Sequence, residues 1–388
     1  MPEALIDITR LLDRRMQGRL PTGIDRVSLE YVRHFGNRST ALVRYAGRWI
    51  ELSPQQSRRI FEALLAPSAN FIPLVRRTVA RAFPRSFGRR FSQPRFLFNT
   101  GHNGLENKDY VHRLHRSRLQ PLFFIHDMIP LTHPEYCRPG EAKRHRARMR
   151  TILTMGHGVI ANSSATLHQL TAYAHAEHLT LPPAVVAPLA PADLSASEAC
   201  PVLNKPYFVI LGTIEPRKNH WLLLQLWRQL IERLGQEAPC LVVIGQRGWE
   251  CENVVDLLER CTTLRGFVFE YPACTDTELA AWLRHARALL FPSFTEGYGM
   301  PLVEALALGV PVIASDLPVF REIAGDIPEY IDPLDGKGWR EMIAAYASAP
   351  ALLRSAQCRR MADFVLPTWA AHFSRVEGLM EQVRDFPA

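Results

Sequence analysis

The chain has 388 residues, which is more than one ordinary hydrophobic core holds, so two domains are expected. Hydrophobic residues make up 47% and charged residues 22%. These values are typical of a soluble globular protein, and no apolar run reaches the roughly 18 residues of a transmembrane helix. The net charge of +8 and the pI near 9.3 indicate an anionic partner: nucleic acid, a membrane surface or a phosphorylated substrate.

The cysteines and the N-terminal stretch both predict a cytoplasmic protein. The seven cysteines are scattered and form no C-x-x-C pair, so neither a structural zinc site nor a disulfide framework is expected. The N-terminal stretch ⟨MPEALIDITRLLDRR⟩ has an acidic residue where a signal peptide begins with basic residues, and its apolar run is broken at once. A reduced, cytoplasmic chain fits these features best.

The first half of the chain alternates short apolar runs with helical patterns, as parallel sheets with crossover helices do. The expected strands are 4–8, 40–45, 95–99, 121–126, 157–161 and 184–187. The expected helices are 23–35, 55–82, 106–118, 140–155 and 163–174.

The second half repeats this alternation more clearly. The expected strands are 207–212, 240–245, 266–271, 287–293 and 311–315. The expected helices are 219–235, 253–261, 276–286, one from Pro301, and 318–324. Runs such as ⟨YFVILG⟩ are apolar on both faces, as strands buried in a parallel sheet are.

A stretch rich in Pro, Ala and Ser separates the halves and predicts a linker at 191–204. The fold class is therefore α/β, with two doubly wound, Rossmann-like domains at 1–190 and 205–366. The segment 367–385 has helical periodicity, and we expect it to pack back on the N-terminal domain. Ligands of such sheets bind beyond the carboxyl ends of the strands, so a central cleft between the domains is the expected site.

A glycine-rich turn between two glutamates follows the expected strand 287–293. Gly297 and Gly299 let the backbone approach a ligand, and the helix start at Pro301 favours an anion such as phosphate. Glu296 before the turn and Glu304 in the helix could each accept sugar hydroxyls. The alternative is a helix with one capping acid and one surface acid.

A second polar turn, ⟨VILGTIEPRKNH⟩, ends the expected strand 207–212. Gly212 permits close approach, and Arg217 and Lys218 are adjacent cations suited to a diphosphate. The alternative is a solvated basic turn, because exposed arginines and lysines are common.

Together, ⟨GTIEPRKN⟩ and ⟨PSFTEGYGMPLVEALALGVPVIASD⟩ resemble the C-terminal half of retaining glycosyltransferases of family 4, which have the GT-B fold. The resemblance is strong over 205–335 and weaker over 1–190. It implies that Arg217 and Lys218 hold the diphosphate of a nucleotide-sugar and that Glu304 binds its ribose. The donor sugar and phosphate would then be held by Glu296 and the backbone of Gly297, Tyr298, Gly299 and Met300.

The resemblance also suggests residues in the N-terminal domain, expected to bind the acceptor. Family members place a histidine after the strand that corresponds to 121–126, so His126 would orient a sugar hydroxyl and support charge near the reacting carbon. Asp127 is a further candidate, as a hydroxyl acceptor. Gly23, in place of the family's Gly-Gly turn, could direct backbone N–H groups at the diphosphate, and Arg26 could contact acceptor or phosphate. A packed histidine and a simple helix cap are the alternatives for His126 and Gly23.

The sequence predicts neither a cofactor nor an essential metal. It contains no D-x-D triplet, and Arg217 and Lys218 could offset the charge of the leaving diphosphate. Retention follows from the resemblance, and no nucleophile stands out for a double displacement. We therefore expect a same-face substitution in which the departing diphosphate helps to deprotonate the acceptor.

The segment 71–95 interleaves arginine with apolar residues, which suits an interface with anionic lipid. The acceptor would then be a lipid-linked or other saccharide in polysaccharide or lipopolysaccharide assembly, with the enzyme peripheral on the inner face of the membrane. The alternative is a solvated basic loop or helix. No nucleic-acid motif is present, so nucleic acid is not an expected partner.

The function expected from these features is a glycosyltransferase, with a mild preference for mannose from GDP-mannose. Within enzymes, a nucleotide-sugar epimerase or a phosphorylase of GT-B fold is the alternative. From another class, the alternative is a non-catalytic nucleotide-sugar-binding subunit.

Overall fold

Two compact units make up the chain in the computed structural model, which describes residues 3–66, 69–87, 91–192, 194, 203–348 and 350–384. Unit 1 comprises Met1–Leu131, Gly140–Leu189 and Trp369–Ala388, and unit 2 comprises Thr132–Pro139 and Ala190–Thr368. Most of the predicted linker 191–204 lies outside the described residues.

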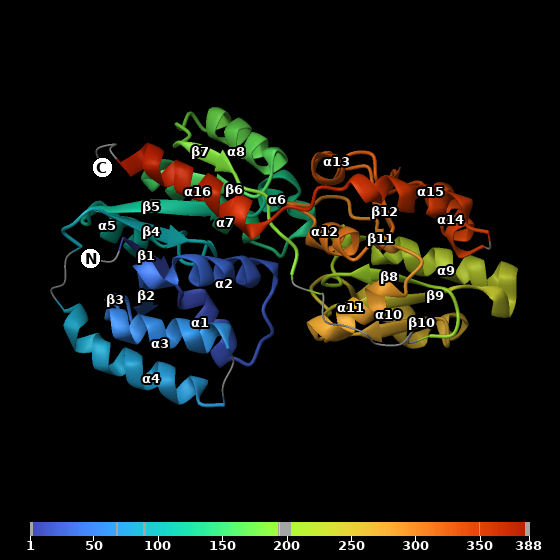
Figure 1. Cartoon of the computed structure of the whole chain (residues 1–388), viewed down its shortest axis with the longest axis horizontal. Helices are drawn as coiled ribbons and strands as arrows, with labels where there is room; N and C mark the ends of the chain where they lie inside the picture. Colours follow the sequence, from blue (N-terminus) through green and yellow to red (C-terminus); the bar gives the residue numbers. More distant parts are fainter. Residues whose placement is uncertain are drawn as a thin grey trace. The chain divides into compact units, whose positions relative to one another are not determined.

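Unit 1 is built on a mostly parallel sheet (Figure 1). Its strands are β1 (Ala4–Asp7), β2 (Ser39–Tyr45), β3 (Arg48–Glu51), β4 (Arg95–Asn99), β5 (Leu119–Ile125), β6 (Gly158–Ala161) and β7 (Ala184–Val186). Its helices are α1 (Thr9–Met16), α2 (Gly23–Phe35), α3 (Pro54–Leu65), α4 (Phe71–Ala82), α5 (Lys108–His115), α6 (Ile129–Thr132), α7 (Glu141–Met155), α8 (Ser164–Ala176) and α16 (Trp369–Arg384). The strand order is β3-β2-β1-β4-β5-β6-β7, and within it only β2 and β3 pair antiparallel.

The last helix of the chain completes the first unit. α16 packs against β6 and β7, although the segment Ala190–Thr368 separates them in the sequence (Figure 1). Its aromatic residue Phe373 lies against Tyr31 of α2, with ring centroids 5.2 Å apart. This face of the sheet therefore depends on residues from both ends of the chain.

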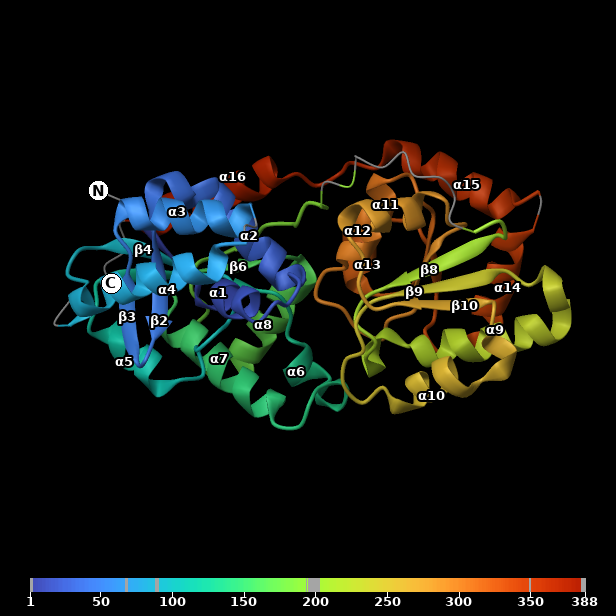
Figure 2. The same ribbon diagram turned by 90° about the horizontal axis from the view of Figure 1, so that it is seen from below.

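Unit 2 has a fully parallel sheet in the order β10-β9-β8-β11-β12-β13. Its strands are β8 (Tyr207–Leu211), β9 (Cys240–Ile244), β10 (Val268–Tyr271), β11 (Leu289–Phe291), β12 (Val312–Ser315) and β13 (Glu329–Ile331). Its helices are α9 (His220–Leu234), α10 (Glu252–Arg260), α11 (Asp276–Arg284), α12 (Met300–Ala307), α13 (Pro318–Ala324), α14 (Gly336–Ala347) and α15 (Leu352–Arg360). Figure 2 shows α9 and α10 on one face of β8, β9 and β10, with α11 and α12 on the other.

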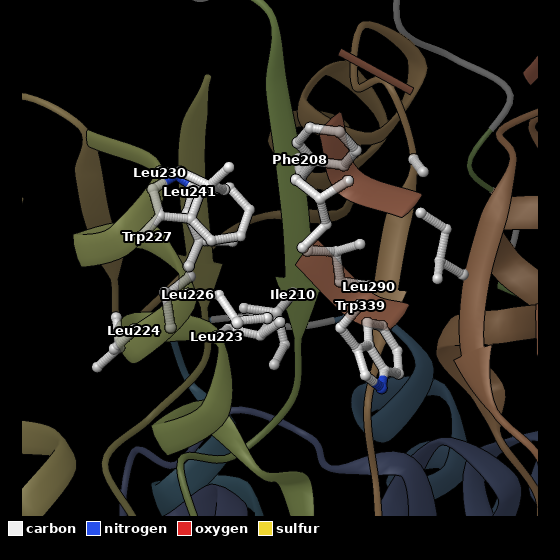
Figure 3. Packing of buried hydrophobic residues seen from close by; sticks show 14 of the residues in the cluster. Phe208, Ile210, Leu223, Leu224, Leu226, Trp227, Leu230, Leu241, Leu290 and Trp339 are labelled. Atoms are coloured by element: carbon white, nitrogen blue, oxygen red, sulfur yellow. The ribbon is translucent and has the colours of Figure 1, made fainter. Parts of the chain in front are cut away.

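The core of unit 2 lies where α9 and α14 cover the sheet. Leu223, Trp227 and Leu230 recur at helical spacing on α9 and meet the side chains of β8 (Figure 3). The Trp227 ring packs edge-on against Phe208, with ring centroids 5.9 Å apart. Its indole N–H donates to the Pro239 carbonyl at 2.9 Å, so the polar atom of this buried ring is satisfied. This packing fixes β8, whose carboxyl end carries candidate site residues.

One sequence-based expectation of local structure was wrong, and several elements were not expected. The helix expected over 55–82 is two helices, α3 and α4. The strands β3 and β13 were not expected, and neither were the helices α1, α14 and α15. In addition, Thr132–Pro139, which we expected within the N-terminal domain, belongs to unit 2.

Candidate active site

The candidate site of unit 2 lies at the point where the strand order reverses. β8 and β11 are neighbours, and the chain leaves them in opposite directions across the sheet. Ligands of open parallel sheets bind at such a point, beyond the carboxyl ends of the strands. The turn after β8 carries Arg217 and Lys218, and the turn after β11 carries Glu296. The backbone N–H of Phe294 donates to the Arg217 carbonyl at 2.8 Å and joins the two turns.

Three of the predicted residues form one ion-pair network. Lys218 Nζ lies 2.5 Å from Glu296 Oε1, and Arg217 Nη1 lies 2.6 Å from Glu296 Oε2. The hydroxyl of Ser293 also donates to Glu296 Oε1, at 2.8 Å. A second Arg217 contact runs from Nη1 to the Thr295 carbonyl at 3.1 Å. The predicted cations and the predicted carboxylate thus meet, although 78 residues separate Lys218 from Glu296.

The side chains of Lys218 and Glu296 are 8% exposed and that of Arg217 is 19% exposed, and this burial affects the charge states of the network. Burial acts to raise the pKa of Glu296, but Arg217 and Lys218 outweigh it and lower that pKa to about 2. Burial lowers the pKa of Lys218, while Glu296 opposes this change. Glu296 is therefore an ionised acceptor at neutral pH, able to receive hydroxyl hydrogens but unable to donate a proton.

Gly212 and Gly299 shape this site through their backbone conformations. Gly212 has φ +140°, and a Cβ there would lie 3.3 Å from Lys218 Cε, so the glycine leaves room for the lysine. Gly299 has φ +117°, and a Cβ there would lie 2.8 Å from the Phe320 ring. Gly299 also caps α12, whose start follows the Glu296 turn.

The other predicted residues of unit 2 surround the start of α12. Met300 is its first residue, and Glu304 lies one turn further on, buried at 5% exposure. Tyr298 is buried as well, whereas Gly297 and Met300 are half-buried. A buried carboxylate on this helix agrees poorly with a surface acid, which was the alternative for Glu304.

Sequence reasoning missed Glu215, which completes the network. Its Oε1 lies 2.6 Å from Arg217 Nε, and the residue is 4% exposed. Burial raises the pKa of this carboxyl, against the opposing effects of Arg217 and Lys218. An acid beside two basic residues looks like a solvated charge in the sequence, and only the fold shows that it is buried.

Sequence reasoning also missed an aromatic cluster in unit 2. The Tyr136 ring stacks on Phe294, with centroids 5.5 Å apart and planes at 10°. The Trp249 indole N–H donates to the Tyr136 carbonyl at 3.1 Å, and the Arg138 guanidinium lies over the Trp249 ring at 5.0 Å. Phe294 is two residues from Glu296, so Tyr136 supports the turn that carries the carboxylate.

In unit 1, His126 follows β5 and is 7% exposed. Its Nε2 lies 2.6 Å from the Thr100 carbonyl, which only accepts, so Nε2 carries the proton and Nδ1 is the acceptor of the neutral ring. Burial lowers the pKa of His126 to about 4. The ring is neutral at pH 7, so orienting a hydroxyl is the role that it can perform, while positive charge is not.

The neighbours of His126 include two residues that sequence reasoning did not select. Arg10 and Asp25 act on the pKa of His126, as does Asp127. Arg10 Nε donates to Asp25 Oδ1 at 2.9 Å. Asp127 Oδ1 accepts from the Ile129 backbone at 3.1 Å, so part of its side chain serves the local turn.

Gly23 is the first residue of α2, and the helix start there is already capped. Asp25 Oδ2 accepts from the Thr22 backbone at 2.8 Å and from its hydroxyl at 2.6 Å. Asp25 also lies 2.8 Å from Arg14 Nε. Because a carboxylate occupies this helix start, the arrangement favours the helix-cap interpretation of Gly23 over diphosphate binding.

The basic segment 71–95 has two faces in its described part. The buried face of α4 comprises Phe71, Val75, Thr78 and Ala82. The exposed face carries the arginines Arg76, Arg77 and Arg81. Beyond the helix, Phe87 is 57% exposed. Arg95 instead forms a two-point contact with Glu51 at 2.9 Å, within the sheet.

Within the described residues, no helix combines the length and the apolar character that crossing a bilayer requires. Among the same residues, no group of three or more His, Cys, Asp or Glu side chains is arranged to hold a metal ion.

Comparison with known families concerns the second half of the chain. Residues 199–327 match the family model of "Glycosyl transferases group 1". This match confirms the predicted resemblance over the part of the chain that carries the ion-pair network.

Two bacterial mannosyltransferases are similar in sequence to part of the chain. The chain is 34% identical over 176 residues to O-antigen chain mannosyltransferase B of Escherichia coli, covering 40% of this chain and 46% of that protein. It is 41% identical over 152 residues to O-antigen chain mannosyltransferase RfbU of Salmonella typhimurium. This match covers 37% of this chain and 39% of that protein. The chain thus matches less than half the length of each relative.

The fold itself is shared along nearly the whole chain. The solved structure of Anabaena HepE in complex with UDP and glucose superposes with a TM-score of 0.65 over 99% of both chains. The sequence identity is 15%, so this likeness establishes the fold alone. The two doubly wound units are those of the GT-B class, as the sequence predicted.

Proposed function

We propose that the protein is a retaining glycosyltransferase that transfers a hexosyl group from a nucleotide-sugar to a saccharide or lipid-linked acceptor. One observation carries the proposal. The half-buried Arg217 and the buried Lys218 meet the ionised Glu296 at the point where the strand order of a doubly wound sheet reverses. In such a site the cations can bind a diphosphate, and the neighbouring carboxylate can accept hydrogen bonds from sugar hydroxyls.

The proposed donor is GDP-mannose, and the proposed process is polysaccharide or lipopolysaccharide assembly. The names of the two O-antigen mannosyltransferases support this choice of sugar and pathway. Arg217 and Lys218 would bind the diphosphate, Glu304 the ribose, and Glu296 hydroxyls of the donor sugar. His126 would accept a sugar hydroxyl through Nδ1. The charge of the leaving group is offset by the two cations, so the reaction would need neither cofactor nor metal, and activity should survive EDTA.

The proposed chemistry is a same-face substitution. The bond from the anomeric carbon to the diphosphate oxygen breaks, and the bond to the acceptor oxygen forms on the same face. The acceptor proton passes to the departing phosphate oxygen. Glu296 is poorly suited to act as a nucleophile, because Lys218 and Ser293 contact Oε1 and Arg217 contacts Oε2. A trapped glycosyl-enzyme intermediate would contradict this step.

A membrane-bound acceptor is supported by the exposed side of α4. Arg76, Arg77 and Arg81 face solvent on this helix, and Phe87 follows it. Clustered arginines attract anionic lipid, and an exposed aromatic ring adds apolar contact. The proposed location is the cytoplasmic face of the membrane, where the enzyme would be a peripheral protein.

The test is release of nucleoside diphosphate from a panel of nucleotide-sugars, with and without membrane lipid extract. Lys218→Met should lower turnover by about 100-fold or more, because a preorganised cation at the leaving group is lost. Lys337→Met is the matched control, since Lys337 forms an exposed pair with Glu341 in the same unit. NMR of the product would establish its anomeric configuration.

The alternatives give different results in the same assay. Nucleotide binding without turnover of any donor would indicate a binding subunit. Conversion of the donor to its epimer without an acceptor would indicate an epimerase. Turnover that Lys218→Met leaves unchanged would overturn the proposed site.

A further inference from the structure

The Glu215 carboxylate sits in a network that is electrically balanced before any ligand arrives. Arg217 lies between two carboxylates, with Nε 2.6 Å from Glu215 Oε1 and Nη1 2.6 Å from Glu296 Oε2. Lys218 adds the second cation, at 2.5 Å from Glu296. The four groups carry two positive and two negative charges, so their net charge is zero.

A bound diphosphate would disturb this balance. The phosphates of a nucleotide-sugar add two negative charges and would share Arg217 and Lys218 with the carboxylates. The negative charge of Glu296 can be stabilised by hydrogen bonds from hydroxyls of the donor sugar. Glu215 is 4% exposed, so neither water nor the sugar readily compensates it. When the attraction between a buried carboxylate and its neighbouring cations weakens, the pKa of the carboxyl group rises and its neutral form is favoured.

The surroundings of Glu215 offer no replacement cation in the described structure. The charged groups that act on it are Arg217, Lys218 and Glu296. The turn after β9 approaches through Gly248, where an added Cβ would lie 3.6 Å from Glu215 Cβ. Arg247 in that turn is paired with Glu259 and with Glu270 instead.

We propose that Glu215 takes up a proton when a nucleotide-sugar binds, and so keeps Arg217 positioned while the phosphates share its charge. The inference rests on the proposed function, since it takes Arg217 and Lys218 as the diphosphate site. The neutral carboxyl still accepts the Arg217 Nε–H through its carbonyl oxygen, so the arginine keeps its orientation. Burial already raises the pKa of Glu215 in the free protein, which makes uptake near neutral pH easier.

Proton uptake makes donor binding dependent on pH. Where one proton is gained on binding, affinity rises by up to about tenfold for each unit that the pH falls. The effect belongs to Glu215 and should disappear in Glu215→Gln, which is neutral in both states. A merely structural role for Glu215 would change affinity without changing the number of protons bound.

The experiment is calorimetric titration of the full chain with GDP-mannose and UDP-glucose at pH 7. Each titration is repeated in buffers of different ionisation enthalpy. A plot of the observed binding enthalpy against the ionisation enthalpy of the buffer has a slope equal to the number of protons taken up. Intact nucleotide-sugars are used because their diphosphate diesters do not titrate near this pH, unlike free nucleoside diphosphates. Glu341→Gln, at an exposed carboxylate of the same unit, is the matched control.

The expected result is net proton uptake in the wild type and in Glu341→Gln, and none in Glu215→Gln. Donor binding without proton uptake in the wild type would overturn the inference and leave the proposed function standing. Equal uptake in Glu215→Gln would overturn it too. If neither nucleotide-sugar binds, the donor site is wrong and the inference falls with it. Should Glu215→Gln fail to fold, wild-type affinity that does not rise from pH 8 to pH 6 would still contradict the proposal.

Discussion

Lys218 Nζ and Glu296 Oε1 lie 2.5 Å apart, joining the turns after β8 and β11 across 78 residues of sequence. Both side chains are 8% exposed. A buried ion pair is costly to break, because removing one partner leaves a charge in a medium of low dielectric constant. The pair therefore links the stability of unit 2 to the charges that the proposed reaction uses.

The destabilisation caused by removing Lys218 should depend on whether Glu296 is present. We expect Lys218→Met to lower the free energy of unfolding by about 3 kcal/mol, because Glu296 keeps Arg217 but loses its lysine. The double variant Lys218→Met/Glu296→Leu should cost less than the sum of the single changes. Urea denaturation of the four proteins measures the coupling. Additive costs would show that the two side chains do not interact in solution.

The tautomer of His126 predicts losses of activity of different size for its two amide replacements. Asparagine places its amide near the Nδ1 position, and glutamine places it near Nε2, which contacts Thr100. If Nδ1 accepts a donor hydroxyl, His126→Asn should retain more activity than His126→Gln, by about tenfold, the worth of one hydrogen bond. The two variants are compared by their initial rates at a saturating concentration of acceptor. Equal losses in both variants would point to packing alone.

The sequence predicted the central strands of both sheets because their apolar runs are long. Residues such as Phe208 and Val209 lie in a strand buried on both faces, and the pattern has no other simple interpretation. β3 was missed because its four residues include a charged residue at each end. The single helix expected over 55–82 overlooked Pro67, a residue that interrupts helices.

The site residues could be predicted from the sequence where polar side chains directly follow a buried strand. Arg217, Lys218 and Glu296 were found because polar residues after buried strands gather at one edge of a sheet. Glu215 was missed because burial of an acid depends on residues far along the chain. Tyr136 was missed because its segment follows strands of unit 1 in sequence but packs in unit 2.

The buried His372 predicts loss of stability in acid. Its Nε2 lies 3.1 Å from the Tyr31 hydroxyl, and Nδ1 lies 3.1 Å from the Ala187 carbonyl. Burial lowers the pKa of His372 to about 4, below its ordinary value of 6.5. A depressed histidine pKa means that the unfolded chain binds the proton more readily. Stability is therefore complete above pH 6.5 and is lost as the pH falls toward 4, by about 2 kcal/mol at pH 5.

Replacing His372 should reduce this pH dependence. We expect His372→Asn to be less stable than the wild type by about 1–2 kcal/mol at pH 7, since the Tyr31 contact is lost. The difference should largely vanish at pH 5. Urea unfolding at both pH values tests this, with the exposed His178→Asn as the control. A difference that stays constant with pH would contradict the assignment.

The exposed arginines of α4 predict binding to anionic vesicles. Replacing Arg76, Arg77 and Arg81 with glutamine should weaken binding to vesicles containing phosphatidylglycerol by about 1 kcal/mol per arginine at low salt. Binding to neutral phosphatidylcholine vesicles should be weak in all proteins. Sedimentation of each protein with either kind of vesicle measures the bound fraction. Arg233→Gln/Arg265→Gln, at exposed sites of unit 2, is the control, and equal loss there would make the effect one of net charge.

His220 begins α9 beside Lys218, yet neither of its ring nitrogens has a hydrogen-bond partner in the described structure. The ring is 2% exposed and lies among Ile210, Leu223 and Leu224. Burial lowers the pKa of His220 to about 3, so the ring is neutral in the folded protein and its polar atoms are uncompensated.

Leucine at this position should therefore stabilise the protein. We expect His220→Leu to raise the free energy of unfolding by about 1–2 kcal/mol at pH 7, because no buried polar atom remains unsatisfied. The gain should grow by about 2 kcal/mol at pH 5, since the wild type must unfold to protonate this ring. Urea unfolding at the two pH values measures both effects, with the exposed His285→Leu as control. Destabilisation at pH 7 would mean that the ring has a polar partner in solution, such as an ordered water.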